Sequence, residues 1–522
     1  MSEISFFHFA SRERNSLAVV DPQCKAWTRG SLADLAHRAA RASRAAGLRP
    51  GDALGILAPN CAEYLAIYLG GIEAGLCVVP LNWHLADDEL AFVLEEAGVR
   101  ALFAHARLGV ISAVASRVLE PGAVRVSIGH LPGFTPLEDF TACQAPEPMP
   151  GPRGRVMPFT SATTGRPKAV ILPDRNADAA RAKTIAWHRS LGIEPQDANV
   201  HLCASMLYHS APLEGAVTAL EMGHAVVLVD RPQPETLLER IDRYRVTTSF
   251  MVPAMFVRLL KLPSRVRRRY STASLRFVVH GGAPCPVEVK RRMLEWWGPI
   301  IWESYGAAEG QGAIVDAANW LRRPGTVGRP IPGCRIKILD GAGRELPAGE
   351  VGFVYLEPHT GDRFEYKGKP EATRASYRGS FITVGDLGYL DDEGFLFLRD
   401  RRADLIISSG MNIYPAEIEQ VLLEHPAVAD CGVCGEPHEL FGEVPKAVVQ
   451  PAEGVVPGPP LTAELLQFLA EKLSPMKLPK RFEYTNELPR DPTGKLRRRY
   501  LRGPRSGNTL PQQENGYGRR DR

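Results

Sequence analysis

Helix-forming stretches and short apolar runs alternate through much of the chain, and their order predicts the architecture. Apolar positions recur at helical spacing between apolar runs of strand length. Helices are expected at 32–46, 63–74 and 235–244, and strands at 53–58, 77–80, 225–229, 248–252 and 275–280. Strands that are separated by helices pair in parallel, so this order predicts an α/β fold with large parallel sheets.

The pattern changes twice towards the C-terminus. Residues 325–398 form short β runs broken by Gly and Pro, which predicts a small barrel or antiparallel sheet. A charged break at Asp400–Asp404, which contains Arg402 and Ala403, precedes a compact unit that extends to Arg502 and has strands expected at 428–433 and 447–450. We therefore expect an N-terminal domain at 1–399, a charged connecting segment at 400–404, a smaller α+β C-terminal domain at 405–502 and a disordered tail at 503–522.

Length, charge and cysteine content narrow the class of protein. A chain of 522 residues exceeds the size of one hydrophobic core, which favours several domains. The net charge of +4 is small for this length and gives no argument for a nucleic-acid partner. The nine cysteines are scattered and odd in number, which favours a reducing cytoplasm. The N-terminus lacks a signal-peptide pattern, and the most apolar segment, Tyr64–Val79, fits a buried helix and strand rather than a membrane span.

The segment Phe159–Ala169 carries the clearest chemical signal. Between two apolar flanks it consists mostly of Thr, Ser, Gly, Arg and Lys, which predicts a strand, a tight loop and a second strand. Hydroxyls and free backbone N–H groups in such a loop form a nest for anions, and Arg166 and Lys168 add positive charge. A polyphosphate is the expected ligand, although the spacing of NTPase P-loops is absent. Taken alone, the segment also fits a solvated surface hairpin.

Seven further motifs follow this loop in order. They are Leu207-Tyr-His209, Gly281-Gly-Ala-Pro284, Tyr305-Gly-Ala-Ala-Glu309, Gly385-Asp-Leu-Gly388, Asp400-Arg401, Ser409-Gly-Met-Asn-Ile-Tyr-Pro-Ala-Glu417 and Leu488-Pro-Arg-Asp-Pro-Thr-Gly-Lys495. Together they resemble the adenylate-forming superfamily of acyl- and aryl-CoA synthetases, carrier-protein adenylation domains and firefly luciferase, and most closely the acyl-CoA synthetase branch. The resemblance implies that a carboxylate attacks the α-phosphorus of ATP to give an acyl-adenylate and pyrophosphate. The acyl group then passes to a thiol or an amine.

The resemblance also implies a role for each matching position. The residues that would bind the β- and γ-phosphates of ATP are Thr160, Ser161, Thr163, Thr164, Gly165 and Lys168. Those that would hold the adenosine are Gly281, Gly282, Ala283 and Pro284 against adenine, Tyr305 and Gly306 on its other face, and Asp386 and Arg401 at the ribose. Glu309 would engage Mg²⁺, since this hard cation prefers oxygen ligands. Lys495 would bridge the substrate carboxylate and the α-phosphate, where negative charge accumulates.

The second half-reaction and the acid have their own candidates. In the family the C-terminal domain is mobile and swings about a hinge, which the resemblance places at 400–404 with Arg402 and Ala403, so the loop that carries Gly410, Met411 and Asn412 would replace Lys495. His209 would lie at the mouth of the acyl pocket as a general base or as a gate. The pocket candidates are His209, Val252, Pro253, His280, Gly281, Gly306, Gly310 and Gln311. Several are small, which favours a ring or a long chain over acetate, while His280 also fits an ordinary core histidine.

Three positions depart from the family pattern and leave the acceptor open. Ala162 stands where the phosphate loop usually has Gly, Ala308 where Thr precedes the Mg²⁺ glutamate, and Ala403 where the hinge has a charged residue. The leading interpretation is an ATP-dependent carboxylic acid–CoA ligase that uses ATP, Mg²⁺ and CoA. The alternatives are an amide synthetase, an acyl-AMP ligase that loads a carrier protein, and a non-catalytic relative. No sequence feature fixes the oligomeric state.

Overall fold

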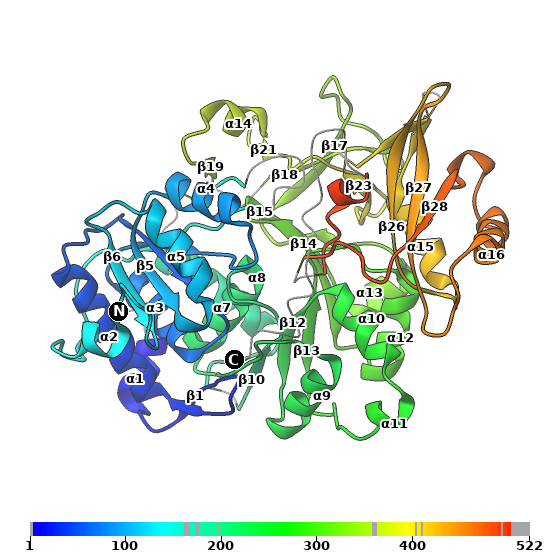
Figure 1. Cartoon of the computed structure of the whole chain (residues 1–522). Coiled ribbons are helices and arrows are strands. Elements are labelled where there is room, and N and C mark those ends of the chain that lie inside the picture. Colours follow the sequence, from blue (N-terminus) through cyan, green and yellow to red (C-terminus); the bar gives the residue numbers. More distant parts are fainter. Residues whose placement is uncertain are drawn as a thin grey trace.

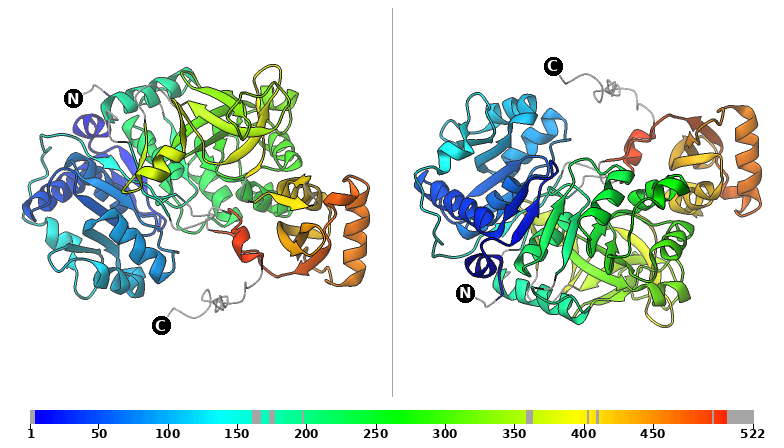
Figure 2. Two further views of the ribbon diagram at one scale, coloured as in Figure 1. Left: turned by 90° about the horizontal axis from the view of Figure 1, so that it is seen from above. Right: turned by 90° about the horizontal axis from the view of Figure 1, so that it is seen from below.

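The computed structural model describes residues 4–160, 167–172, 177–196, 198–357, 363–401, 404–408, 411–491 and 494–502. The protein is mixed α/β, with parallel sheets at its core and a separate C-terminal unit that lies to one side of the larger body (Figure 1, Figure 2). The predicted fold class is confirmed. The tail expected at 503–522 lies outside the described residues.

The first parallel sheet has six strands in the order β7-β6-β5-β3-β4-β8. Most of its strands are joined by helices, which is the connection that parallel pairing requires. The strands are β3 (Ala53–Leu57), β4 (Cys77–Pro80), β5 (Val99–His105), β6 (Val124–Ile128), β7 (Thr135–Pro136) and β8 (Arg155–Val156). The helices of this region are α2 (Arg29–Ala45), α3 (Ala62–Glu73), α4 (Asp87–Ala97), α5 (Gly109–Val118) and α6 (Leu137–Thr141).

The second large sheet has nine strands in the order β16-β15-β14-β13-β12-β10-β11-β1-β2. Its central pairs are parallel, and the edge strands β2, β15 and β16 are antiparallel. The strands are β1 (Leu17–Val20), β2 (Ala26–Thr28), β10 (Val200–Cys203), β11 (Ala225–Leu228), β12 (Thr248–Met251), β13 (Phe277–His280), β14 (Ile301–Ala307), β15 (Gly310–Val315) and β16 (Arg329–Pro330). Helices of this region are α7 (Ala177–Ser190), α8 (Ser210–Glu221), α9 (Pro234–Arg243), α10 (Pro253–Lys261), α11 (Ser264–Arg267), α12 (Val287–Trp297) and α13 (Ala317–Arg322).

Antiparallel strands form the third part of the larger body, as the short β runs after residue 325 predict. Six strands pair in one sheet: β17 (Arg335–Leu339), β18 (Gly352–Glu357), β20 (Tyr377–Arg378), β21 (Phe381–Ile382), β22 (Asp386–Leu390) and β23 (Leu396–Arg401). A separate two-stranded ladder joins β9 (Val170–Ile171) to β19 (Glu365–Tyr366). This ladder links the end of the predicted phosphate loop to the antiparallel part of the chain.

The C-terminal unit is a five-stranded sheet covered by helices. Its elements are β24 (Ile406–Ser408), β25 (Met411–Ile413), α15 (Pro415–Glu424), β26 (Val428–His438), β27 (Gly442–Pro451), α16 (Pro459–Ala470) and β28 (Arg481–Tyr484). The long hairpin of β26 and β27 is paired along its whole length, from Val428 with Pro451 to His438 with Gly442. The apolar runs at 428–433 and 447–450 therefore mark only the buried parts of longer strands.

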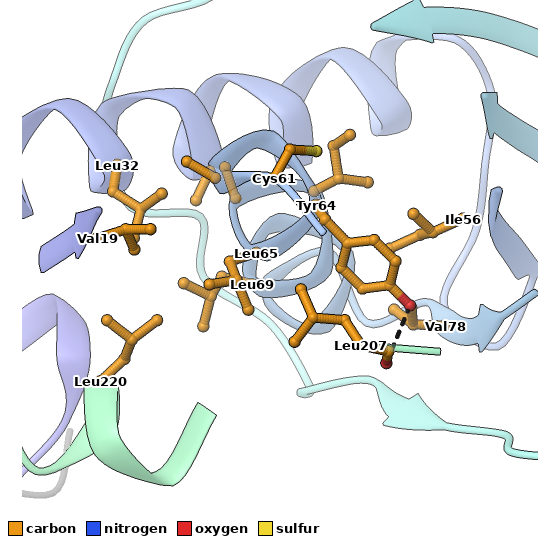
Figure 3. Packing of buried hydrophobic residues seen from close by; sticks show 14 of the residues in the cluster. Val19, Leu32, Ile56, Cys61, Tyr64, Leu65, Leu69, Val78, Leu207 and Leu220 are labelled. Atoms are coloured by element: carbon orange, nitrogen blue, oxygen red, sulfur yellow. Dashed lines mark hydrogen bonds between the residues drawn. The ribbon is translucent and has the colours of Figure 1, made fainter. Parts of the chain in front are cut away.

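One buried cluster connects the two parallel sheets. It extends from Leu54, Ile56 and Val78 of the six-stranded sheet to Leu220 of α8 and Val226 of β11, with α2 and α3 between them. Figure 3 shows Tyr64 of α3 inside this cluster, with its hydroxyl directed to the carbonyl oxygen of Leu207 at 3.4 Å. Burial raises the pKa of Tyr64 well above its usual value, so the phenol stays a neutral donor.

A buried amide fastens the ends of the two sheets to each other. Asn60 follows β3, and its Nδ2 donates to the carbonyl oxygens of Ser205 and Val229, both at 2.8 Å. Its Oδ1 accepts from the backbone N–H of Leu207 at 2.8 Å. Because Asn60 is 3% exposed, water does not replace these bonds. The segment from Ser205 to Leu207, which leads into His209, is thereby held to the six-stranded sheet.

The state of the cysteines and the character of the helices can be compared with the expectations from sequence. None of the nine cysteines, all of which lie in the described part of the chain, forms a disulfide. No described helix combines the length and apolar character needed to cross a membrane, and Tyr64–Val79 is the buried helix and strand that was expected.

We expect Asn60→Ala to destabilise the fold by roughly 3 kcal/mol or more, because three buried backbone groups lose their partner. The measurement is the shift in the denaturant concentration at the midpoint of the first unfolding transition. Asn15→Ala, which truncates an exposed asparagine in the same region, is the control and is expected to change stability by less than about 0.5 kcal/mol. Equal shifts in the two variants would contradict the role of Asn60.

Candidate functional site

Hydrogen bonds hold the two ends of the predicted phosphate loop together, as expected for a loop between two strands. Phe159 and Ala169 form an antiparallel bridge, and Val170 N–H donates to the carbonyl oxygen of Pro158 at 2.9 Å. Thr160 closes the loop twice, since its N–H donates to Lys168 O at 2.9 Å and its hydroxyl accepts from Lys168 N–H at 3.2 Å. The loop residues Ser161, Ala162, Thr163, Thr164 and Gly165 lie outside the described residues.

Tyr366 connects the predicted Mg²⁺ ligand to the predicted phosphate lysine. Glu309 lies in the tight turn between β14 and β15 and is 6% exposed. The hydroxyl of Tyr366 donates to Glu309 Oε1 at 2.7 Å, and Lys168 Nζ lies 4.6 Å from the centre of the Tyr366 ring. Burial and the charge of Glu309 raise the pKa of Tyr366, so the phenol remains protonated and able to donate.

The surroundings of Glu309 suit a magnesium ion carried by a phosphate. Among the described residues, no three Asp, Glu, His or Cys side chains gather into a site that could hold a metal. A cation at Glu309 would therefore take its other oxygens from substrate phosphates and water, which is the usual arrangement for Mg²⁺. The single carboxylate, oriented by Tyr366, fits that arrangement.

Sequence reasoning missed Tyr366. It belongs to a strand of two residues, and 57 positions separate it from Glu309. No spacing rule connects two such residues. They meet only because β19 pairs with β9, directly after the phosphate loop.

A second pair of candidates meets at the start of β22. The hydroxyl of Tyr305 donates to Asp386 Oδ2 at 2.7 Å, and Asp386 is 7% exposed. Gly385 precedes it with φ of 85°, a left-handed conformation that glycine adopts without strain. Arg401 stands directly opposite Asp386 on β23, although its side chain lies outside the described part of the structure. Asp386 and Arg401 thus come from paired strands of the antiparallel sheet, and Tyr305 reaches Asp386 from β14 of the nine-stranded sheet.

Gly281 allows two strands to pack closely, whereas the resemblance implies that it contacts adenine. A Cβ at Gly281 would lie 2.6 Å from the carbonyl oxygen of Ser304 on the adjacent β14, so the glycine permits close approach of the two strands. Gly282 has φ of 79° and nothing within 4 Å of an added Cβ, so its requirement is conformational. These glycines shape the turn that Ala283 and Pro284 complete.

His280 is a core residue at the end of β13. It is fully buried, packs edge-on against Phe256 at a ring-centre distance of 5.3 Å, and has no hydrogen-bond partner for either ring nitrogen among the described residues. Its Nε2 lies 3.5 Å from Glu303 Oε2, which accepts from Lys290 Nζ at 2.7 Å. Burial lowers the pKa of His280 well below its usual value, so the ring is neutral.

A cluster of rings surrounds His209, immediately before α8. Tyr208 contacts the His209 ring at a centre distance of 4.4 Å, and Tyr208 Oη lies 3.0 Å from Nδ1 of His84. Trp83 stacks on His84 at 3.6 Å. Sequence reasoning missed Trp83 and His84, although both follow the carboxyl end of a parallel strand, where binding residues of α/β proteins collect.

The loop that carries Lys495 reaches this cluster from the C-terminal unit. Asp491 and Lys495 close a tight turn, with Asp491 N–H donating to Lys495 O at 2.9 Å and Lys495 N–H to Asp491 Oδ1 at 3.0 Å. Gly494, with φ of 80°, rests on α10: an added Cβ would lie 2.3 Å from Cβ of Ala254. Asp491 and Lys495 both lie close enough to His209 to shift its pKa in opposite directions.

Arg490 holds this turn to the C-terminal sheet. Its guanidinium forms a bidentate pair with Asp430 at 2.7 Å through both nitrogens, and it donates to the carbonyl oxygen of Gly494 at 2.8 Å. Polar contacts that cross between the units include Arg499 with Glu89 at 3.0 Å and Lys261 Nζ with the carbonyl oxygen of Ala429. The turn is therefore firmly held within its own unit.

The remaining predicted residues are distributed as follows. Val252 caps α10 next to Pro253, and Gly310 and Gln311 face Ala307 and Gly306 across the β14–β15 hairpin, with the Gln311 side chain outside the described residues. Met411 and Asn412 lie exposed on β25. Arg402, Ala403 and Gly410 lie outside the described residues.

Comparison with known proteins gives consistent matches over most of the chain. The family model described as AMP-binding enzyme matches residues 6–359, and the AMP-binding enzyme C-terminal domain matches residues 417–495. A fatty acid–[acyl-carrier-protein] ligase of Streptomyces coeruleorubidus is 34% identical over 483 residues, 89% of this chain and 89% of its own.

Two solved structures illustrate the range of chemistry among similar proteins. The o-succinylbenzoate CoA synthetase of Bacillus subtilis, in complex with its acyl-adenylate intermediate, has a TM-score of 0.81 and 28% identity, covering 97% of this chain and 99% of that chain. The amide bond synthetase of Marinactinospora thermotolerans has a TM-score of 0.80 and 27% identity, covering 93% and 96%.

We expect Tyr366→Phe to weaken the response to Mg²⁺ while keeping the ring beneath Lys168. Loss of a hydrogen bond to a buried carboxylate costs about 1.5–3 kcal/mol, so the Mg²⁺ concentration for half-maximal ATP-dependent pyrophosphate formation is expected to rise roughly tenfold or more. Tyr355→Phe is the control, because Tyr355 is equally buried but bonds to Arg378 in the antiparallel sheet. An unchanged Mg²⁺ response in Tyr366→Phe would show that Glu309 does not hold the cation.

Proposed function

This chain belongs to the AMP-binding enzymes of the adenylate-forming superfamily, and on that premise we propose that it is an ATP-dependent carboxylic acid–CoA ligase that acts through an acyl-adenylate. The observation that supports the proposal best is the Asp491–Lys495 turn, in which Gly494 packs on Ala254 of α10 and Lys495 lies near enough to His209 to lower its pKa. A lysine on a separate unit, held against the site by Gly494 on Ala254, is suited to neutralise charge in one step and withdraw for the next.

In the first step the residues of this chain would hold ATP and the substrate carboxylate next to each other. The phosphate loop and Lys168 would bind the β- and γ-phosphates, and Glu309 would hold Mg²⁺. When bound, Mg²⁺ would supply positive charge near the leaving pyrophosphate. Tyr305 would cover the adenine while its hydroxyl orients Asp386, whose two oxygens suit the paired ribose hydroxyls. Lys495 would lie between the substrate carboxylate and the α-phosphate, where the charge density is greatest.

In the second step the C-terminal unit would turn about the 400–404 segment. The exposure of Met411 and Asn412 in the present arrangement supports this, because the same hairpin would face the site after the turn. Exposed ion pairs between the units, such as Arg499 with Glu89, cost little to break. Ala403 leaves a small side chain at the pivot.

The acceptor and the acid are proposed on separate grounds. CoA is the lead acceptor, on the resemblance to CoA synthetases. An amine is the second candidate, and the likeness to an amide bond synthetase supports it. A carrier-protein thiol is the third, on the identity to an acyl-carrier-protein ligase. For the acid, the small residues Gly281, Gly306 and Gly310 favour an aryl or long-chain group, and a cytoplasmic location stays a prediction.

The direct test of the proposed function is pyrophosphate release with ATP and Mg²⁺ across aryl, fatty and alicyclic acids, with and without CoA. Turnover is expected to require CoA and to fall about a hundredfold or more in Lys495→Ala, since one positioned charge at the reacting phosphate is lost. Lys480→Ala, at an exposed lysine of the same unit, is the control. Equal turnover in Lys495→Ala and wild type would overturn the role of Lys495, and a stall near one equivalent despite CoA would redirect the acceptor to an amine or a carrier protein.

Gly494→Ala tests whether docking of the turn serves the first step. The added methyl meets Ala254 and forces a left-handed φ on alanine, so adenylation is expected to slow by roughly tenfold or more, and by more than acyl transfer from a preformed adenylate. Gly454→Ala is a matched control, because Gly454 has φ of 81° in the same unit but nothing within 4 Å. Equal slowing of both steps in Gly494→Ala would contradict a role specific to adenylation.

A further inference from the structure

Four side chains at the mouth of the site form a polar cluster that the first half-reaction does not use. Trp83 and His84 follow β4 of the six-stranded sheet, and Tyr208 and His209 precede α8 of the nine-stranded sheet. The bond of 3.0 Å between His84 Nδ1 and Tyr208 Oη crosses from one sheet to the other. Tyr208 is 6% exposed, so this bond is shielded from water.

The cluster contains buried polar atoms that no described residue satisfies. Nε1 of Trp83 and Nε2 of His209 are both buried and lack a hydrogen-bond partner within the described ranges. Orphaned buried polar atoms are rare in proteins and call for an explanation. Two of them beside one cluster indicate a place where a polar group of a ligand enters.

Both histidines are neutral at physiological pH. Burial and Arg497 lower the pKa of His84 to about 4, against the opposite effect of Asp491 and Asp230. Burial, His84 and Lys495 lower the pKa of His209 to about 4, and Asp491 opposes them. Above that pH each ring is neutral, so its unprotonated nitrogen can accept a proton.

Three of those charged groups, Asp491, Lys495 and Arg497, belong to the C-terminal turn. If that turn withdraws for the second half-reaction, both cations leave and water reaches the rings, so the pKa of each histidine returns towards its ordinary value. The histidines then become stronger bases at the moment when an acceptor must lose a proton. A base whose pKa lies near the working pH is the more effective one.

We propose that Tyr208 and His84 relay the proton that the acceptor loses during acyl transfer, a role that rests on the proposed function and deepens it. The acceptor sulfur or nitrogen bonds to the acyl carbon, and its proton passes to Tyr208 Oη while the phenol proton passes to His84 Nδ1. The bond between the acyl carbon and the AMP oxygen then breaks, and AMP leaves as an anion. His84 later returns the proton to water, so atoms and charge balance.

The relay accounts for the arrangement better than His209 acting alone. Lys495 lies close enough to His209 to affect its pKa, and Nε2 of His209 bonds to no described residue that could carry a proton onward. His84 and Tyr208 bond to each other across the two sheets, so a proton taken up at Tyr208 Oη has a route to His84. His209 then orients the acceptor through its unpartnered Nε2, and the proton leaves by way of His84.

The test separates the two half-reactions in single turnovers. The enzyme is first loaded with adenylate from the acid that gives the fastest pyrophosphate release, and acyl transfer is then followed with CoA and, separately, with benzylamine. His84→Asn keeps a hydrogen-bonding atom near the Nδ1 position but is not basic, and Tyr208→Phe interrupts the relay. Each is expected to lower the ratio of the transfer rate to the adenylation rate about a hundredfold at pH 7. The transfer rate of each variant is expected to rise towards wild type as pH increases, because hydroxide replaces the missing base.

His188→Asn is the matched control, since His188 is also partly buried with a lowered pKa and bonds through Nδ1, to Thr184 O at 2.8 Å, away from the cluster. Its ratio of rates is expected to equal that of wild type. A ratio within about twofold of wild type in His84→Asn and Tyr208→Phe, or a loss that pH does not change, overturns the relay even though adenylate forms. A wild-type enzyme that releases no pyrophosphate with any acid would instead overturn the proposed function, and this inference with it.

Discussion

The structure depends on one buried amide that joins two parallel sheets. Asn60 bonds to three backbone groups of the nine-stranded sheet from a position just after β3 of the six-stranded sheet. A parallel sheet presents its binding residues at the carboxyl ends of its strands, so two sheets make one site only if those ends are held together. Asn60 does this, and Tyr64 adds a bond to the same segment. The position of Tyr208 and His209 against His84 follows from that clamp.

The chemistry also requires a part that moves, and the structure separates it from the rigid part. Within the C-terminal unit the turn of Lys495 is firmly held, because Arg490 ties it to Asp430 through two nitrogens. Towards the larger body it rests on the close contact between Gly494 and Ala254 and on exposed ion pairs such as Arg499 with Glu89. Exposed ion pairs contribute little free energy, so the unit can leave without large cost. Precise placement and easy release are compatible because different contacts provide them.

Sequence patterns predicted what depends on periodicity and on local motifs. The alternation of apolar runs and helices predicted β3, β4, β11, β12 and β13 and their parallel pairing, and the polar segment at Phe159–Ala169 predicted a closed loop. The strands β26 and β27 were predicted too short, because their outer residues include Gly, Pro and charged positions and carry no continuous apolar run. Tyr366 and His84 were missed because their partners, Glu309 and Tyr208, are distant in sequence and meet only through sheet pairing and the Asn60 clamp.

The most direct measurement of the central claim follows the oxygen of the acid. If this chain activates a carboxylate by attack on the α-phosphorus, one carboxylate oxygen remains on AMP when the acyl group is transferred. A turnover with acid labelled with ¹⁸O in both carboxylate oxygens should therefore give AMP that carries a single ¹⁸O, as mass spectrometry can detect, and unlabelled pyrophosphate. Turnover that gives unlabelled AMP would contradict an acyl-adenylate and the account built on it.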